Sequence, residues 1–213
     1  MADTLDIVTL AEARSAVNIN TAGYVADDTR LAAFVTAISR HFDNLVGPVV
    51  QRTVTAEVQD GGRNFITLDL APISAVTSIT EYSGTAATVL ASASNTSQPS
   101  NGYLLDPWRD GFYKGRIYRR SGNTNASFPD GRGNVVITYT AGRYANTAAV
   151  DQRFKTATEL TLANVFRREQ RPVNPGFGGP EAMNDVVATA FPGYLVPNAA
   201  LAYLVDDIIG SVA

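Results

Sequence analysis

Residues 106–110 hold the side chains with the clearest capacity for chemistry. They read Asp-Pro-Trp-Arg-Asp, so two carboxylates, Asp106 and Asp110, flank the only tryptophan, Trp108. Glycosidases use such a carboxylate pair, which makes a hydrolase one hypothesis. Positions four apart on a loop do not fix the separation of the carboxylates, and Pro107 is typical of a surface turn. Aromatic side chains are enriched in interface cores, so we expect Trp108 to anchor a contact between subunits.

Other chemical motifs are missing or incomplete. His41 is the only histidine and the chain has no cysteine, whereas a catalytic histidine needs a nucleophile and an orienting carboxylate. Residues 176–179 read Gly-Phe-Gly-Gly, but no strand precedes them and Pro180 follows, so they form no dinucleotide fingerprint. No phosphate-binding loop, calcium loop or histidine-rich metal pattern is found. We therefore expect no enzyme, no cofactor and no metal.

Composition and charge narrow the class of protein further. The chain has 213 residues, 45% of them hydrophobic, and a net charge of −3, which is typical of a globular protein without a basic field for nucleic acid. Two short basic clusters, residues 114–120 and 167–171, are typical of solvated faces. No apolar run approaches the ~20 residues of a membrane span. The first residues lack a signal-peptide pattern, so we expect synthesis in the host cytoplasm and no membrane partner.

Helical patterns occupy both sides of a central region. Thr9 and Glu12 have the spacing of a capping box, which predicts a short helix over residues 10–17. A stronger amphipathic helix is expected over residues 28–45 and ends at Gly47. A third helix, residues 149–168, has apolar residues spread widely around it, which indicates burial on more than one side. The helix at residues 28–45 and the helix at residues 149–168 should form a bundle core.

The central region changes to a period of two. Strands are predicted at residues 53–58, 65–70, 75–82, 116–119 and 135–140. The first two flank residues 60–62 (Asp-Gly-Gly) and favour a hairpin. Residues 83–102 are rich in Ser, Thr, Ala and Asn, and we interpret them as a long hairpin tip or loop.

The end of the chain is apolar. Residues 173–180 are rich in proline and glycine and form a linker, after which Pro197 opens a last helix. The apolar face of this helix needs something to cover it, and we expect a partner to do so. The expected partner-binding residues are Trp108, Tyr194, Leu201, Leu204, Val205, Ile208 and Ile209.

Five segments in order resemble the head–tail connector (neck adaptor or head completion) proteins of tailed bacteriophages. The matching segments are residues 10–13 (Leu-Ala-Glu-Ala), the acid-opened helix at 28–45, residues 72–79 (Pro to Ser-Ile), residues 139–142 (Tyr-Thr-Ala-Gly) leading to Arg168-Glu169, and residues 193–197 (Gly-Tyr-Leu-Val-Pro). The order of these segments is more specific than any one of them.

This resemblance implies a subunit of a virion neck ring, which in that family is dodecameric. Such a ring lies under the portal protein, extends the DNA channel, and docks a stopper, tail terminator or other neck protein. Genomic DNA would pass through it without specific binding. The C-terminal segment of such proteins reaches out to a neighbour or to the portal.

The expected fold class is α+β, with a helical bundle core, an inserted antiparallel β region and a C-terminal extension ending in a helix. The corresponding domains are residues 1–48 with 147–172, residues 49–146, and residues 173–213. The alternative functions are a carbohydrate- or partner-binding β module and a hydrolase. The long helix at residues 28–45 and the apolar C-terminus argue against the β module.

Overall fold

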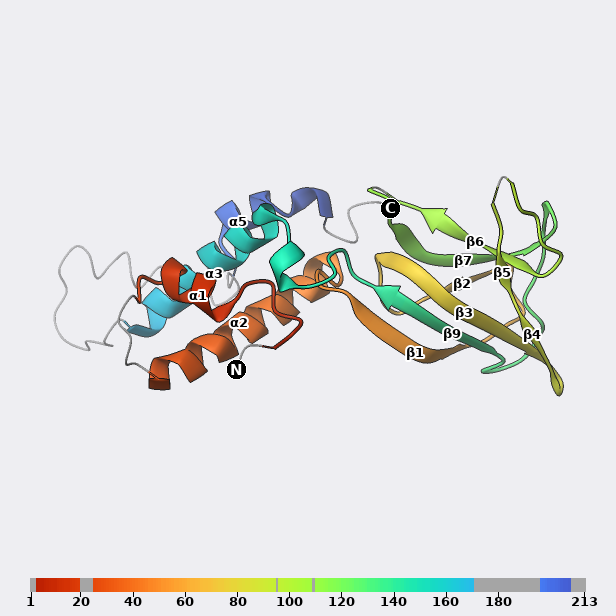
Figure 1. Ribbon diagram of the computed structural model, residues 1–213, viewed down its shortest axis with the longest axis horizontal. Helices are drawn as coiled ribbons and strands as arrows, with labels where there is room; N and C mark the ends of the chain where they lie inside the picture. The colour runs from red at the N-terminus through yellow and green to blue at the C-terminus, as the bar shows by residue number, and fades with distance from the viewer. Residues whose placement is uncertain (1–2, 20–24, 95, 109, 171–195, 208–213) are drawn as a thin grey trace. The chain divides into compact units, whose positions relative to one another are not determined.

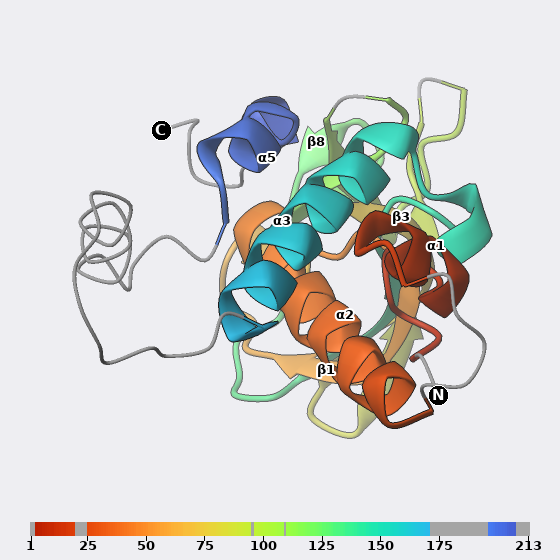
Figure 2. The same cartoon turned by 90° about the vertical axis from the view of Figure 1, so that its left-hand side faces the viewer.

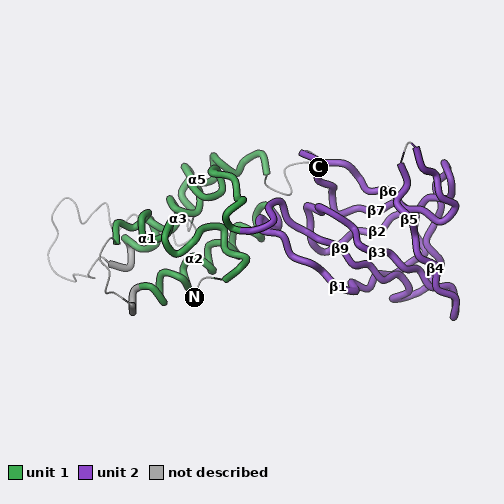
Figure 3. The backbone as a smooth tube through the Cα atoms, viewed as in Figure 1, with its two compact units in different colours: residues 1–46, 147–213 green, residues 47–146 purple. Residues whose placement is uncertain are grey.

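The computed structural model describes residues 3–19, 25–94, 96–108, 110–170 and 196–207. The chain forms two compact units (Figure 3). Residues 1–46 and 147–213 make the first, called here the helical unit, and residues 47–146 make the second, called the sheet unit. The predicted division into three domains stays a prediction.

Helix α1 lies where the sequence predicts it, and α2 ends near its predicted end but begins three residues before residue 28. Helix α1 (Leu10–Ala16) has the predicted capping box: the Glu12 amide donates to the Thr9 hydroxyl at 3.2 Å, and the Thr9 amide donates to the Glu12 carboxylate at 2.7 Å. Helix α2 (Val25–Val46) is followed by Gly47 with a φ of 76°, a left-handed conformation that favours glycine and ends helices.

Helix α3 (Gln152–Gln170) follows the short 3-10 helix η1 (Thr147–Ala149) and is the central element of the helical unit. It packs against α1, α2 and the short helix α5 (Asn198–Ala202), as Figure 2 shows. Phe154, Ala157 and Leu162 have no exposed surface. The prediction that this helix is buried on more than one side is confirmed. The 3-10 helix η2 (Val205–Asp207) follows α5.

The sheet unit is one mixed sheet of nine strands (Figure 1). Its main path runs β1-β9-β3-β7-β6-β5, while β2 and β8 also pair with β7 and β4 pairs with β3. All pairs are antiparallel except β5 with β6. The strands are β1 (Arg52–Gln59), β2 (Phe65–Thr67), β3 (Ile73–Ser83), β4 (Ala86–Val89), β5 (Ala91–Ser92), β6 (Gly102–Pro107), β7 (Tyr113–Ser121), β8 (Thr124–Asn125) and β9 (Val135–Ala141).

Alternate residues of the long strands build a core for this unit. Val135, Ile137 and Tyr139 of β9 are fully buried, and the intervening residues are partly exposed. Successive side chains of a strand point to opposite faces, so one face of β9 lies in the core. Ile79 of β3 and Ile117 of β7 belong to the same cluster.

The predicted fold class is wrong. The dominant element is the nine-stranded mixed sheet, and the described residues contain only four α-helices, so no helical bundle forms the core of the molecule. The sheet unit is inserted between the two parts of the helical unit, but it does not depend on a helical core, because it buries a hydrophobic cluster of its own. It is also mixed rather than antiparallel, since β5 pairs with β6 in parallel.

The predicted hairpin around residues 60–62 does not form. β1 pairs with β9 and β2 pairs with β7, so the two strands do not pair with each other. The loop between them is held by another segment: the Gly61 amide donates to the Gly131 carbonyl at 3.0 Å, and the Gly62 amide donates to the Pro129 carbonyl at 3.1 Å. A distant chain segment therefore determines this geometry, and the local turn signal does not.

The segment interpreted as a long hairpin tip or a loop, residues 83–102, contains strands. Gly84, with a φ of 60°, allows the chain to turn, and β4 then pairs back on β3. β5 follows directly and pairs with β6. Strands of two to four residues are shorter than the window in which alternation can be recognised, which is why composition alone indicated a loop.

Candidate interaction surfaces

The C-terminal segment, residues 196–207, lies against α3 of its own chain. Pro197 is the N-cap residue of α5, and its fixed φ suits this position. Ala200 and Leu204 have no exposed surface, and Val196 is 5% exposed. The apolar residues of the segment are therefore covered in part by its own chain.

An ion pair fastens the same segment. The Arg153 guanidinium, on α3, lies 2.8 Å from the Asp207 carboxylate, whose side chain is only 2% exposed. Arg153 also lies over the ring of Phe154, at 4.9 Å from the ring centre. Removing one partner of a buried ion pair leaves an uncompensated charge, so loss of Arg153 would destabilise the docked segment.

The predicted partner-binding residues have different surroundings. Leu204 is buried within its own chain, Leu201 is partly exposed, and Val205 is 58% exposed. Tyr194, Ile208 and Ile209 lie outside the described residues. Val205 lies close in sequence to Tyr203, which is 47% exposed, so part of the segment presents apolar surface to solvent. Partner binding by these residues stays a prediction.

Trp108 follows β6 and is partly exposed. Its amide donates to the Phe112 carbonyl at 2.9 Å, and the guanidinium of Arg143 lies 5.3 Å from the centre of its ring. A cation over an indole face is an attractive contact that fixes the ring. Trp108 is thus a partly exposed aromatic side chain in contact with Arg143, and its role as a subunit anchor stays a prediction.

The two carboxylates beside Trp108 have different surroundings. Asp106 is part of β6 and lies 3.7 Å from the ammonium of Lys114 on β7. Asp110 is exposed, in the turn before β7, with a φ of 57°. Among the described residues, no hydrogen bond or shared ion pair joins these two carboxylates. Among the described residues, no group of three histidine, cysteine or acidic side chains could hold a metal ion.

A buried charge pair in the sheet unit was missed by sequence reasoning. The Arg119 guanidinium donates to both carboxylate oxygens of Glu81, at 2.9 and 2.8 Å, and to the Asn101 side chain at 3.1 Å. Glu81 is 5% exposed and Arg119 is 7% exposed. Strand alternation was the available signal, because Glu81 lies on the buried face of its strand with Ile79.

The basic cluster at residues 114–120 is divided by the same alternation. Arg119 points into the core, whereas Arg116 lies over the ring of Phe65 at 5.5 Å from its centre. The Arg120 guanidinium donates to the Asn125 side chain at 3.1 Å. The cluster is therefore not one continuous cationic surface. In the second cluster only the exposed Arg167 has a described side chain.

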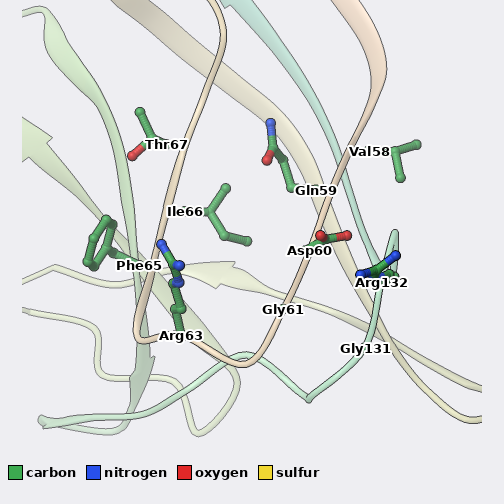
Figure 4. Close-up of a pocket in the computed structure, with 10 residues that line it drawn as sticks. All are labelled: Val58, Gln59, Asp60, Gly61, Arg63, Phe65, Ile66, Thr67, Gly131 and Arg132. Carbon is green, nitrogen blue, oxygen red and sulfur yellow. The ribbon is translucent and has the colours of Figure 1, made fainter.

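A cleft of about 740 Å³ lies in the sheet unit, between β1 and β2. Figure 4 shows residues 58–60 and 65–67 on two separate stretches of chain, with Arg63 and Arg132 among the side chains that line the cleft. It occupies the place where the sequence predicted a hairpin.

Comparisons with known proteins identify the fold. No family model and no curated protein matches the sequence. A solved chain from "Virion of native gene transfer agent (GTA) particle" is similar with a TM-score of 0.58 and 18% identity, over 97% of this chain and 92% of that chain. A chain from "Neck of empty GTA particle computed with C6 symmetry" is similar with a TM-score of 0.50 and 21% identity, over 81% and 82% of the two chains.

These likenesses show that the chain shares the fold of proteins in a virus-like particle. The agreement extends over nearly the whole chain, so it includes both units. Within the described residues, no helix is long and apolar enough to cross a membrane.

Proposed function

We propose that the chain is a structural protein of the neck of a phage-like particle, and not an enzyme. The observation that carries this proposal is the fold shared with a chain of a gene transfer agent virion along almost the full length of both chains. The second solved chain comes from the neck of such a particle. The resemblance of five sequence segments to head–tail connector proteins points to the same place.

The finer role is that of a head–tail adaptor. Copies of the chain form a ring under the portal protein, extend the DNA channel, and dock a stopper, tail terminator or other neck protein. The neck that was computed with sixfold symmetry supports a cyclic arrangement, and the number twelve comes from the family resemblance alone. The net charge of −3 supports passage of DNA without specific binding, because few phosphate charges would be neutralised.

The C-terminal segment is the proposed connection to the neighbouring subunit or the portal. Twenty-five residues, 171–195, separate α3 from Val196. A chain of that length extends up to about 80 Å, which allows residues 196–207 to dock on the α3 of another copy. In such an exchange Leu204 and Asp207 would make with the neighbour the contacts that they make within one chain. Tyr194, Leu201, Val205, Ile208 and Ile209 would then add contacts around them.

Deletion of residues 191–213 tests this connection. We expect a folded monomer, as judged by circular dichroism and sedimentation, that no longer joins portal rings in electron micrographs. The matched control is Val89→Ala, which changes one exposed residue of β4, outside the C-terminal segment, and should join the rings. A truncated protein that assembles normally would contradict the role of the segment.

The location is tested in the particle itself. Particles made without the chain should have DNA-filled heads that lack tails, because the portal would have no adaptor to which the next neck protein could bind. An epitope tag on the chain should be labelled by antibody at the junction of head and tail. Labelling of the head surface or the tail tip would contradict the proposal.

A further inference from the structure

Two strands in the sheet unit each have an edge that no strand of the described residues occupies. β1 is the terminal strand of the sheet and pairs with β9 alone, while β2 pairs with β7 alone. Both strands line the cleft of about 740 Å³ (Figure 4). Edge strands carry unpaired backbone donors and acceptors, so they are ready to pair with another extended chain.

The hydrogen bonds of β2 establish which backbone groups face the cleft. The Leu68 amide donates to the Gly115 carbonyl at 2.7 Å, and the Arg119 amide donates to the Asn64 carbonyl at 2.9 Å. Because such bonds alternate along an antiparallel pair, Phe65 and Thr67 direct their backbone groups away from β7. Asp69 lies two residues after Thr67, and its amide donates to the Glu57 carboxylate of β1 at 3.2 Å. The backbone groups of Phe65 and Thr67 that point away from β7 therefore face β1.

The same reasoning applies to β1. The Tyr82 amide of β3 donates to the Asn134 carbonyl at 2.8 Å. Backbone groups of alternate residues face the same neighbouring strand, so those of Val136, two residues after Asn134, face β3 and not β1. Val58 is the partner of Val136 in β1, and its backbone groups therefore point away from β9. Val58 lines the cleft, and its side chain is 57% exposed.

Hydrogen bonds lie at both ends of the cleft. At one end the Glu57 carboxylate accepts from the Tyr139 hydroxyl at 2.6 Å as well as from the Asp69 amide. At the other end the Gly61 amide donates to the Gly131 carbonyl and to the Asn134 side chain, at 3.0 and 2.9 Å. Contacts within the sheet unit thus border the cleft at both ends.

The charges of the cleft favour a carboxylate. Arg63 and Arg132 line it and are exposed, and neither guanidinium forms an ion pair with an acid of the described residues. Asp60, the acid that lines the cleft, accepts a hydrogen bond from the Gly133 amide at 2.7 Å. The sheet unit has nine basic and seven acidic residues, whereas the whole chain has a net charge of −3. Arginine forks match carboxylates well.

We propose that this cleft binds an extended, carboxylate-bearing segment of a partner protein, which adds a strand between β1 and β2. Backbone hydrogen bonds to Val58, Phe65 and Thr67 give the affinity, and Arg63 with Arg132 select an acidic segment. The proposal rests on the proposed function only for the identity of the partner, which would be an adjacent protein of the neck. Binding itself is a property of the isolated chain.

A blocked, fluorescently labelled octapeptide of alternating valine and glutamate is the probe. We expect saturable binding to the full chain, weakened by salt, as measured by fluorescence anisotropy. The same peptide with lysine in place of glutamate, and the same peptide with N-methylated valine amides, should each bind at least tenfold more weakly. Equal binding of the three peptides, or no binding at millimolar peptide, would overturn the proposal.

Variants of the chain test the strand addition directly. Thr67→Pro removes one amide donor that faces the cleft and breaks no bond to β7, so the fold should persist while affinity falls about tenfold. Thr67→Val keeps the amide and should bind normally. Arg63→Gln with Arg132→Gln should remove the preference for glutamate, whereas Arg120→Gln, outside the cleft, should not. Equal affinities for Thr67→Pro and Thr67→Val would overturn the proposal.

A second copy of the chain is the competing occupant. Self-association of the wild-type chain is measured by sedimentation velocity and compared with that of Thr67→Pro. We expect the two to be the same. If Thr67→Pro abolished a self-association of the wild type, the cleft would bind a second copy and not a different protein. Peptide binding and the location of the chain in the particle are measured separately. If the peptide does not bind, the location of the chain in the particle still tests the proposed function. If the location is wrong, peptide binding still tests the cleft.

Discussion

The helical unit and the sheet unit differ in how far the chain itself covers their surfaces. In the helical unit, α3 packs against α1, α2 and α5, so residues 196–207, which include α5, cover part of α3. In the sheet unit, two strand edges line a cleft that no described segment fills. A segment that covers a surface of its own chain can instead bind the same surface of a neighbouring copy. An open strand edge needs a segment from a separate partner. The two units therefore offer two kinds of connection.

The largest effect is expected from the buried charge of the sheet unit. Arg119→Met leaves Glu81 buried without a partner and should lower the free energy of unfolding by about 3–5 kcal/mol. Lys114→Met, on the same strand but 52% exposed, should cost less than about 1 kcal/mol. Denaturant unfolding measures both. Replacing Glu81 and Arg119 together by methionine should recover much of the loss, and equal losses for Arg119 and Lys114 would contradict the assignment.

A comparable loss in the helical unit tests whether the two cores are separate. Phe154→Ala removes a ring with no exposed surface and should cost about 3–5 kcal/mol through lost burial and a cavity. Amides of β9 should keep their protection from hydrogen exchange, because their core lies in the other unit. Phe34→Ala should cost less, since Phe34 is only partly buried beneath Arg30. Simultaneous loss of protection in both units would show one cooperative core.

A smaller and more local effect is expected where the C-terminal segment covers α3. Leu204→Ala should weaken docking of residues 196–207 by about 2 kcal/mol, and the amide of Asp207 should exchange faster. Val205→Ala, at a residue 58% exposed, should change stability by less than about 0.5 kcal/mol. If both variants leave the exchange unchanged, Leu204 does not fasten the segment.

The smallest effect concerns the acidic surface of the helical unit. Burial, and then the nearby Glu12 carboxylate, raise the pKa of Glu159 above its ordinary value of 4.5. The folded state thus favours the protonated acid, and its contribution to stability is lost as the pH rises through the raised pKa. Glu159→Gln should be more stable than wild type at neutral pH by less than about 1 kcal/mol. Thermal melts should show this difference disappear below about pH 4, and a difference independent of pH would contradict it.

Local signals predicted the helices better than the sheet. The capping box at Thr9 and the glycine at Gly47 act within one turn of chain, and both were confirmed. The hairpin at residues 60–62 was wrong because residues 129–131, about seventy positions away, hold its loop. Strands β4 and β5 were missed because their pairing with β3 and β6, and not their composition, makes them strands.

The sequence by itself determined the repeating patterns: the helical period of α2 and α3, the positions at which these two helices begin and end to within a few residues, and the period of two in β3 and β9. The periods of helices and strands are local properties of the backbone, so they can be recognised in a single chain. Only the tertiary structure decided which strand edges pair, that Glu81 meets Arg119, and that a cleft separates β1 from β2. These depend on contacts between residues far apart in sequence, and nothing in the local pattern encodes the partner of an edge.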